Sequence, residues 1–330
     1  MAEYLTNTTD LTLVANAIRT KGGTTELLTY PDEFVTAIQA IQTGTELKII
    51  VTVTSGATVT ATKGSLSVSG TSVNGTCTLT MPEAGTWSVT ATLNGKTSNT
   101  MNVSVKDSYA LTLNFLKDNF ADNDWNSIIA ACHSGSVPST WVVGNSKTMT
   151  INGASYQVDI IGKNHDTYTA GGTAPLTFQL HDCYGETKNM NSSNTNSGGW
   201  TSCDMRSTHL PAILALMPTE VKNGIREVNK LTSAGNQSAT INTTADKLFL
   251  LSEVEIFGSA TYSFHGEGTQ YDYYKAGNSK VKNVSGSPSN WWARSPFTNS
   301  PLYFCFTKGE GRISYDGSIR SLGVAFGFCF

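Results

Sequence analysis

The sequence predicts a multidomain protein in which a short N-terminal helical segment and an all-β sandwich precede an α+β domain. Apolar residues recur at helical spacing up to about residue 44 and then alternate with period two from Leu47 to Val105. From about residue 110, helical patterns stand among Gly- and Asn-rich loops. A length of 330 residues also exceeds one ordinary core. The expected segments are 1–45, 46–108 and 109–330.

Two short helices are expected in the first segment. The apolar residues at helical spacing are Leu11, Val14 and Ile18 in the first helix and Phe34, Ile38 and Ile41 in the second. Pro31 suits the first position of the second helix. Neither helix is long enough to be stable alone. The segment is therefore either a simple helical hairpin or a piece for attachment or oligomerisation.

The second segment has the pattern of a small antiparallel β-sandwich. Trp87, Val89 and Ala91 alternate with hydroxyl-bearing residues, and a second alternating run covers 101–105. Asn94-Gly95, between the two runs, is a strong signal for a two-residue hairpin turn. Short Val- and Thr-rich strands separated by Gly-containing turns are typical of an immunoglobulin-like domain. We interpret this segment as a spacer, since it contains no histidine and hardly any acidic residue.

Composition excludes several classes of partner. Charged residues make up 14% of the chain and the formal net charge is −3, with no Lys/Arg cluster to neutralise a row of phosphates. We therefore expect no nucleic-acid partner. The first ten residues lack the pattern of a signal peptide, and no apolar stretch approaches membrane-spanning length. We expect a soluble product made in the cytoplasm, without membrane insertion.

The third segment is expected to be rich in loops. Helical patterns occur at 125–132 and around 210–231. The polar stretch from Asp182 to Ser202 is predicted to be a long surface loop. Trp291, Trp292 and Arg294 have the character of a buried scaffold, and we expect Arg294 to pair with Glu253 or Glu255.

The apolar sequences at 291–296 (Trp-Trp-Ala-Arg-Ser-Pro) and 323–329 (Gly-Val-Ala-Phe-Gly-Phe-Cys) resemble a C-type-lectin-fold family. This family is common in phage tail proteins and in the variable proteins of diversity-generating retroelements. The resemblance covers about residues 112–330 and includes Gly199-Trp200, Arg206 and the run 251–255. Residues 10–41 are similar to the start of many phage tail or baseplate proteins.

The resemblance implies a phage tail-tip receptor-binding protein, assembled in the host cytoplasm and carried in the virion. Its variable region, about 297–322, would recognise a host-cell-surface protein or glycan without catalysis, cofactor or metal. Other phage tail proteins are implied partners, and a homo-oligomer, with a trimer favoured, is a further expectation. The expected ligand-binding residues are Thr298, Asn299, Leu302, Tyr303, Phe306, Arg312, Ser314, Tyr315, Asp316, Ile319, Arg320 and Leu322.

The residues of this span support a binding surface independently of the family. Tyr and Arg are the side chains that most often carry binding energy at interfaces. If Phe304 and Ile313 point into the core of a β-hairpin, then Tyr303, Arg312 and Ser314 point outward. The alternative is that these aromatic residues are ordinary core residues.

The sequence indicates a catalytic or metal site less strongly than it indicates a binding surface. The six cysteines, which form no C-x-x-C pair and are expected to be buried free thiols, are Cys77, Cys132, Cys183, Cys203, Cys305 and Cys329. His181 and His209 are interpreted as hydrogen-bonded structural groups, because the five histidines form no H-x-x-x-H pair. Neither the Glu-Pro-Asn nor the Gln-Pro-Asp tripeptide of calcium-dependent lectins occurs.

The same fold type also serves formylglycine-generating enzymes, which rely on two cysteines closely spaced in sequence. Cys305 and Cys329 are far apart, so this motif does not carry over. A cysteine-dependent oxidase of that type, or a glycan-processing tail protein, is the alternative function. Glycan cleavage usually needs a pair of carboxylates, and no acidic pair stands out in the sequence.

Overall fold

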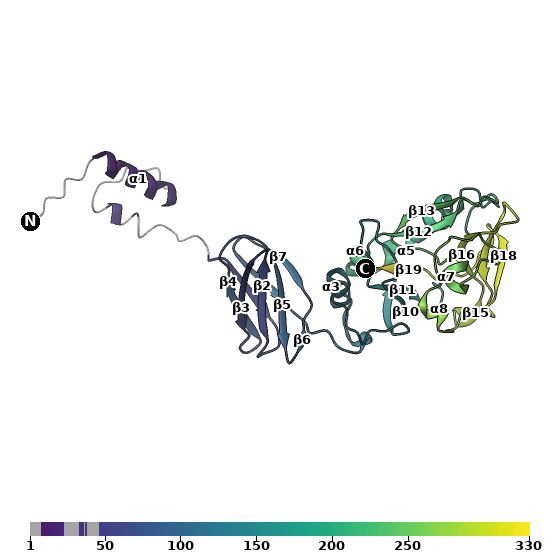
Figure 1. Ribbon diagram of the computed structural model, residues 1–330, viewed down its shortest axis with the longest axis horizontal. Helices are drawn as coiled ribbons and strands as arrows, with labels where there is room; N and C mark the ends of the chain where they lie inside the picture. The colour runs from purple at the N-terminus through teal and green to yellow at the C-terminus, as the bar shows by residue number, and fades with distance from the viewer. Residues whose placement is uncertain (1–7, 23–32, 36, 38–45) are drawn as a thin grey trace, which may run out of the picture. The chain divides into compact units, whose positions relative to one another are not determined.

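The protein is a β-rich multidomain chain. The structure is a computed structural model that describes residues 8–22, 33–35, 37 and 46–330 (Figure 1). It divides into two compact units, Met1–Asn114 and Phe115–Phe330. The expected boundary after residue 108 is therefore too early. The strand Ser108–Thr112 (β8) pairs with Lys48–Thr52 (β1), which makes it part of the first unit.

The first unit begins with helix α1, Thr8–Gly22. Ala15 and Ile18 are buried and cluster with Phe34, whose neighbouring described residues are also helical. Val14 is exposed, so its expected place on the buried face is wrong, and Ala15 takes that place one residue further round the helix. Ile38 and Ile41 lie outside the described residues.

The strands that the structure describes in the first unit form two sheets. One has the order β4-β1-β8, where β4 is Thr76–Thr80. The other has the order β3-β2-β5-β6, and β7 also pairs with β5. Its strands are β2 (Thr58–Lys63), β3 (Leu66–Thr71), β5 (Gly85–Leu93), β6 (Lys96–Thr97) and β7 (Met101–Val105). The expectation of a purely antiparallel arrangement is wrong, because β1 and β8 run parallel.

The hairpin turn predicted at Asn94-Gly95 is confirmed. Leu93 pairs with Lys96 across it, and both turn residues have positive φ, 51° and 78°. Two positive φ angles are what a type I′ turn requires. The predicted alternation also holds, since Trp87, Val89 and Ala91 are buried while their neighbours in β5 are more exposed.

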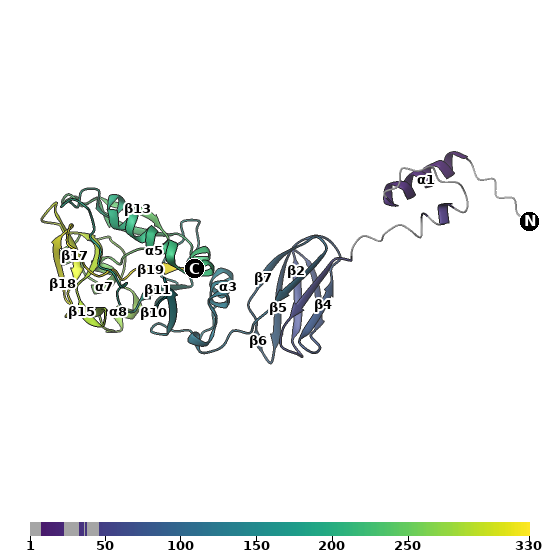
Figure 2. The ribbon, with the colours of Figure 1, turned by 180° about the vertical axis from the view of Figure 1, so that it is seen from behind.

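The second unit is built around a four-stranded sheet of order β19-β11-β10-β9 (Figure 2). Its strands are β9 (Ser146–Ile151), β10 (Ala154–Lys163), β11 (Leu176–Leu180) and β19 (Gly327–Cys329). The last strand of the chain thus returns to strands formed early in the unit. All five residues of β11 are buried, so this central strand is covered on both of its faces.

The helices of this unit are short. They are η1 (Phe120–Asp122), α3 (Trp125–Ser134), α4 (Gly199–Ser202), the π-helix η2 (Met205–His209), α5 (Leu210–Leu216), α6 (Thr219–Gly224), α7 (Glu253–Phe257) and α8 (Asp272–Lys275). The helix predicted at 125–132 is confirmed as α3, which is capped by Asp124 and ends at Gly135 in the left-handed conformation. The helical pattern around 210–231 holds only to Gly224. Beyond it the chain forms strand β12, Val228–Ser233, where ladder pairing with β13 overrides the apolar spacing.

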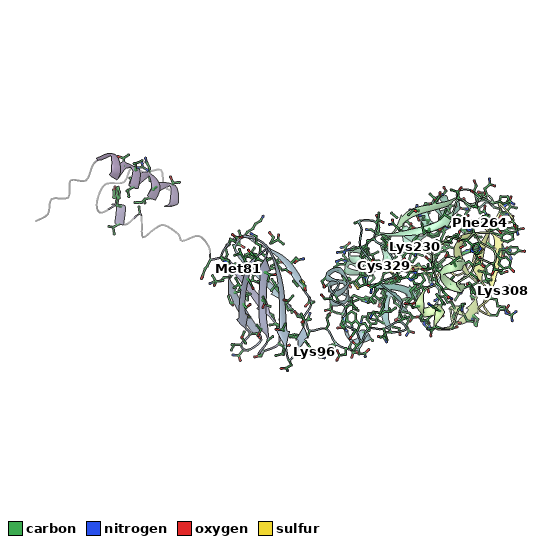
Figure 3. The ribbon with its side chains drawn as sticks, viewed as in Figure 1. Met81, Lys96, Lys230, Phe264, Lys308 and Cys329 are labelled. Atoms are coloured by element: carbon green, nitrogen blue, oxygen red, sulfur yellow. The ribbon has the colours of Figure 1, made fainter. Side chains whose placement is uncertain are left out.

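Three smaller sheets complete the second unit. They are β12 with β13 (Ile241–Asp246), β14 (Lys282–Val284) with β15 (Ser287–Ser289), and β16 (Trp291–Pro296) with β17 (Tyr303–Thr307) and β18 (Ile313–Gly317). Lys230 and Cys329 lie in the interior of the unit (Figure 3). The interior therefore holds charged groups as well as apolar ones.

Candidate functional site

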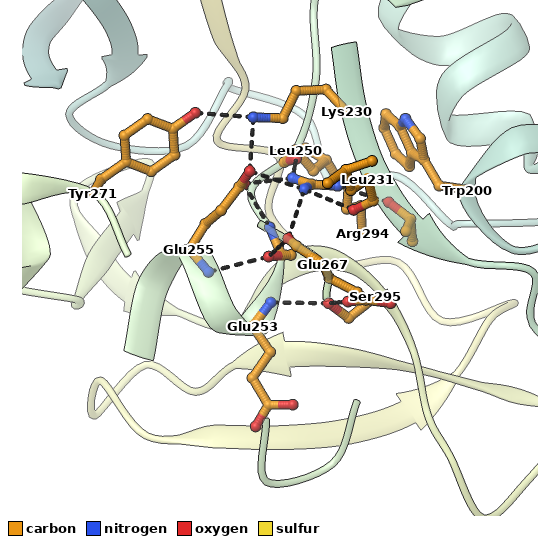
Figure 4. A network of polar contacts seen from close by, with 12 residues as sticks. Trp200, Lys230, Leu231, Leu250, Glu253, Glu255, Glu267, Tyr271, Arg294 and Ser295 are labelled. Carbon is orange, nitrogen blue, oxygen red and sulfur yellow. Dashed lines mark hydrogen bonds and ion pairs between the residues drawn. The ribbon is translucent and has the colours of Figure 1, made fainter. Parts of the chain in front are cut away.

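The scaffold below the hairpin is β16. Trp291, Trp292 and Arg294 are fully buried there, as predicted. Of the two expected partners of Arg294, the structure selects Glu255, whose two carboxylate oxygens lie 2.5 and 2.9 Å from Nη1 and Nη2. This is the bidentate geometry that a guanidinium is suited to make. Its other N–H groups donate to Thr232 and to the carbonyls of Leu231, Leu250 and Glu267 (Figure 4).

Glu255 also belongs to a larger buried ionic network. Lys230 Nζ lies 2.7 Å from Glu255 Oε1 and 2.7 Å from Asp166 Oδ1, and it donates to the hydroxyl of Tyr271. Burial alone would raise the pKa of Asp166, but the ion pair and hydrogen bond with Lys230 outweigh it and hold the pKa at about 2. For Glu255, Arg294 and Lys230 likewise outweigh burial, so its pKa is lowered.

A second buried carboxyl group, Glu267, has the opposite electrostatics. Its Oε1 accepts from the backbone N–H of Ser233 at 2.8 Å, and its Oε2 accepts from the hydroxyl of Ser295 in β16. Burial raises the pKa of Glu267 to about 7, although both hydrogen bonds act to lower it. Neutral hydrogen bonds compensate less for lost hydration than a full counter-charge does.

The loop that precedes α4 supports the hairpin from another side. Asn196 is fully buried, and its side-chain N–H₂ donates to the carbonyls of Ser300 and Tyr303 at 2.9 and 2.7 Å. Its side-chain oxygen accepts from the backbone N–H of Asn236 at 2.7 Å. The prediction that residues 182–202 form only a surface loop is therefore partly wrong. Hydrogen bonding inside the unit compensates the burial of this polar side chain.

The register of β17 and β18 corrects the expected directions of the side chains. Tyr303 and Phe304 do lie on opposite faces, as predicted, since they are adjacent in a strand. Ser314, however, is paired with Phe306 and Ile313 is paired with Thr307. Directly paired residues share a face. Ser314 therefore lies on the face opposite to Tyr303, and Ile313 and Phe304 do not share a face.

An aromatic cluster covers the face of the hairpin that carries Tyr303. Tyr315 stacks on Phe297, with ring centroids 3.9 Å apart, and Tyr303 stacks on Tyr315 at 5.9 Å. Tyr262, from the loop after α7, meets Phe297 and Tyr315 edge-on at 5.9 and 5.1 Å. Tyr315 is 39% exposed and Phe297 is buried. We call these four residues the aromatic cluster; they form a partly exposed surface of rings and phenolic hydroxyls.

The structure brings only part of the predicted set into this cluster. Tyr303 and Tyr315 belong to it, whereas Phe306 is 5% exposed and packs edge-on against Trp292. Phe306 is therefore corrected to a core residue. The other predicted residues that are exposed are Asn299, Leu302, Arg312, Ile319 and Arg320, and those that are partly buried are Thr298, Ser314, Asp316 and Leu322.

Two residues of the site lie outside the predicted set. Phe297 was placed at the start of the variable span but not among its binding residues, and it supplies the ring on which Tyr315 stacks. Tyr262 lies more than thirty residues upstream of the span. A lone tyrosine in a Gly- and Ser-containing loop carries no periodic signal, so only the three-dimensional contact reveals it.

The cysteines and histidines behave as predicted. All six cysteines are free and buried. Burial raises the pKa of Cys305 and of Cys329 well above that of an ordinary thiol. His181 Nδ1 lies 2.7 Å from Asp159, and this hydrogen bond raises the pKa of His181. His209 Nε2 lies 3.1 Å from the side-chain oxygen of Asn189.

Within residues 8–22, 33–35, 37 and 46–330, no group of three or more His, Cys, Asp or Glu side chains is placed to hold a metal ion. None of the helices described there has both the length and the apolar character needed to cross a membrane.

These features define a class: a β-rich multidomain protein whose second unit displays aromatic side chains on a buried polar scaffold. A family described as a domain of unknown function (DUF6273) matches residues 170–329, just under half of the chain. No curated protein matches the sequence. Among solved structures, the chain is similar to a DUF4876 family protein from Bacteroides thetaiotaomicron, with 9% identity and a TM-score of 0.16. That similarity covers 44% of this chain and 34% of the other, about a third of its length.

Proposed function

We propose that this protein is a receptor-binding protein of a phage tail, and that its second unit is a C-type-lectin-like domain that binds a host-cell-surface protein or glycan without catalysis. The observation that carries the proposal is the aromatic cluster on the hairpin β17–β18. Tyrosine offers a large contact area at a low cost in side-chain entropy, and it is enriched at binding surfaces.

The scaffold supports this proposal. Tyr303 and Tyr315 lie on strands whose opposite face carries the buried Phe304 and Phe306. Asn196 and Arg294 hold the surrounding chain through hydrogen bonds. A rigid support lowers the conformational cost of binding. In the proposed protein, residues 297–322 are the variable region of a fixed scaffold, as in variable proteins of diversity-generating retroelements.

The first unit has a spacer role in this proposal. Its two sheets, including the parallel pairing of β1 with β8, fit an immunoglobulin-like sandwich, and residues 1–45 would attach the protein to other tail proteins or join its copies. A trimer in the virion would multiply contacts that are individually weak.

Binding to a panel of bacterial cells tests the proposal. Wild type should bind some cell types selectively. A Tyr303→Ala/Tyr315→Ala variant should lose at least about 30-fold in affinity for them, because even one hot-spot side chain contributes roughly 2 kcal/mol. Tyr109→Ala, which removes a similarly exposed tyrosine from the first unit, is the matched control and should bind as wild type does.

A doubly substituted variant that is folded and still binds normally would move the ligand surface away from the hairpin. Absence of selective binding by wild type across the panel would contradict the receptor-binding function itself. The oxidase alternative gains no support from Cys305 and Cys329, since their raised pKa values keep both thiols protonated at neutral pH.

A further inference from the structure

The aromatic cluster is made from two separate parts of the chain. Phe297, Tyr303 and Tyr315 come from the hairpin region, whereas Tyr262 comes from the loop between α7 and α8. Tyr262 is partly exposed, and its ring meets both Phe297 and Tyr315 edge-on. Its carbonyl also accepts from the backbone N–H of Thr298 at 2.9 Å. The loop and the hairpin region are therefore joined by a backbone hydrogen bond as well as by ring contacts.

The conformation of this loop depends on one buried carboxylate. Glu253, the first residue of α7, is 0% exposed and accepts hydrogen bonds from three successive backbone N–H groups. Thr261 donates to Oε1 at 2.8 Å, Tyr262 lies 3.1 and 3.0 Å from the two oxygens, and Ser263 donates to Oε2 at 2.7 Å. Charge-assisted hydrogen bonds of this kind are about twice as strong as neutral ones.

Glu253 is itself fixed to the scaffold. Its backbone N–H donates to the hydroxyl of Ser295 in β16 at 2.9 Å, and that hydroxyl donates to Glu267. The helix that carries it is closed at its start by a reciprocal capping box between Ser252 and Glu255. Hydrogen bonds therefore connect the backbone at Tyr262, through Glu253, to the buried network around β16.

We infer that Tyr262 is a ligand-contacting residue that forms a constant side of the binding surface, and that Glu253 is the residue that positions it. This inference rests on the proposed function and specifies its site. Substitutions in the hairpin β17–β18 would alter one side of the binding surface, while the loop that carries Tyr262 would leave the other side unchanged. The cluster holds four aromatic rings and no charged side chain, so the group it accepts has an apolar face that can pack on the rings.

The experiment measures affinity for the cell type that wild type binds best. Tyr262→Ala should lose about 10-fold in affinity, and Tyr262→Phe, which retains the ring, should stay within about 3-fold. Glu253→Gln should also lose about 10-fold in affinity. The glutamine side chain has only one oxygen, which cannot accept the three N–H groups that two carboxylate oxygens accept. Treatment of the cells with protease or with periodate distinguishes a protein side chain from a sugar ring as the source of the group.

Amide hydrogen exchange separates positioning from a general loss of structure. In Glu253→Gln, the amides of Thr261, Tyr262 and Ser263 should exchange faster, while Trp292, which donates to Gly323 in the wild type, keeps its protection. Glu220→Gln, a change at an exposed glutamate, is the matched control and should alter neither measurement. If Glu253→Gln does not fold, Glu253→Asp, which withdraws the carboxylate by one methylene, takes its place.

Normal affinity of folded Tyr262→Ala, together with weak binding by the Tyr303→Ala/Tyr315→Ala variant, would overturn the inference and leave the proposed function intact. Unchanged exchange at 261–263 in Glu253→Gln would overturn the positioning role of Glu253. Wild type that binds no cell type would overturn the proposed function and, with it, the ligand-contacting role of Tyr262.

Discussion

The two units of this chain differ in the polar side chains that they bury. Among the described residues of the first unit, the buried polar side chains are Ser72, Ser98 and Asn99, none of which is charged. The second unit buries complete ion pairs, with Arg294, Lys230 and Glu255 each 2% exposed or less. The first unit is thus stabilised by alternating apolar residues, whereas the second also depends on a buried ionic network.

The difference follows from how the backbone N–H and C=O groups of each unit are hydrogen-bonded. In the first unit, strand ladders pair most backbone groups, and a few side chains are enough at the irregular points, as where Asn99 Oδ1 accepts from the N–H of Asn114. The second unit consists largely of loops, whose backbone groups have no ladder partners. Arg294, Asn196 and Glu253 satisfy them instead, each binding backbone atoms of other segments. Such a network makes loops rigid only when its members are fully hydrogen-bonded.

The largest effect is expected from Arg294→Met. This change leaves Glu255 charged and buried with half of its counter-charge removed. It also removes the guanidinium donor from three carbonyl groups, of which that of Glu267 keeps the hydroxyl of Ser252 as a donor. The free energy of unfolding of the second unit should fall by about 4 kcal/mol. Urea unfolding followed by amide exchange in β12 and β16 measures it.

Lys308→Met, a change at an exposed cation in the same unit, is the control and should shift stability by less than about 0.5 kcal/mol. A loss of stability below about 1 kcal/mol for Arg294→Met would contradict this difference between the units, since the ionic network would then contribute little to the stability of the second unit.

The next effect is a pH dependence. Glu267 has a pKa of about 7 when folded and an ordinary value of 4.5, so its contribution to stability is fully present below pH 4.5 and is lost as pH rises through 7. The loss should amount to about 3 kcal/mol. Glu267→Gln, which imitates the protonated acid, should abolish this part of the pH dependence.

The difference in stability between wild type and Glu267→Gln, measured by urea unfolding at several pH values, isolates this group from the histidines that titrate in the same range. A difference that does not change between pH 4.5 and 8 would show that Glu267 keeps an ordinary pKa. Below this window Asp166, with a pKa of about 2, still contributes stability, which is lost only as pH falls through 2.

The smallest effect concerns a kind of turn that occurs in both units, in which a glycine has a positive φ angle. Gly95 in the first unit and Gly311 in the second have φ of 78° and 80°, and a Cβ at either position meets no atom closer than 3.5 Å. Substitution by alanine should therefore cost only the left-handed strain, about 1 kcal/mol at each site. Equal shifts in urea unfolding would show that local turn energetics are the same in both units. A much larger loss of stability for the Gly311 variant would show that this turn is coupled to the buried ionic network of the second unit.

Local patterns in the sequence were sufficient for part of the fold. The alternation around Trp87, the turn at Asn94-Gly95 and the helix at 125–132 were all predicted correctly. Each depends on interactions within a few residues, where side-chain period and turn chemistry decide the conformation. The buried scaffold of Trp291, Trp292 and Arg294 was predicted for a similar reason, because large aromatic residues beside an arginine have few stable positions other than a paired interior.

Long-range contacts decided the rest. Phe306 was expected to be exposed, but its strand register turns it toward Trp292, and a shift of one residue would reverse that choice. Tyr262 joins Tyr315 across more than fifty residues of sequence, and Glu253 reaches Ser295 across 42. By itself the sequence determined the alternating strand around Trp87, the turn at Asn94-Gly95, the helix at 125–132 and the buried scaffold of β16. Only the tertiary structure decided which side chains meet at the surface, because that depends on register and on buried polar partners that no local period encodes.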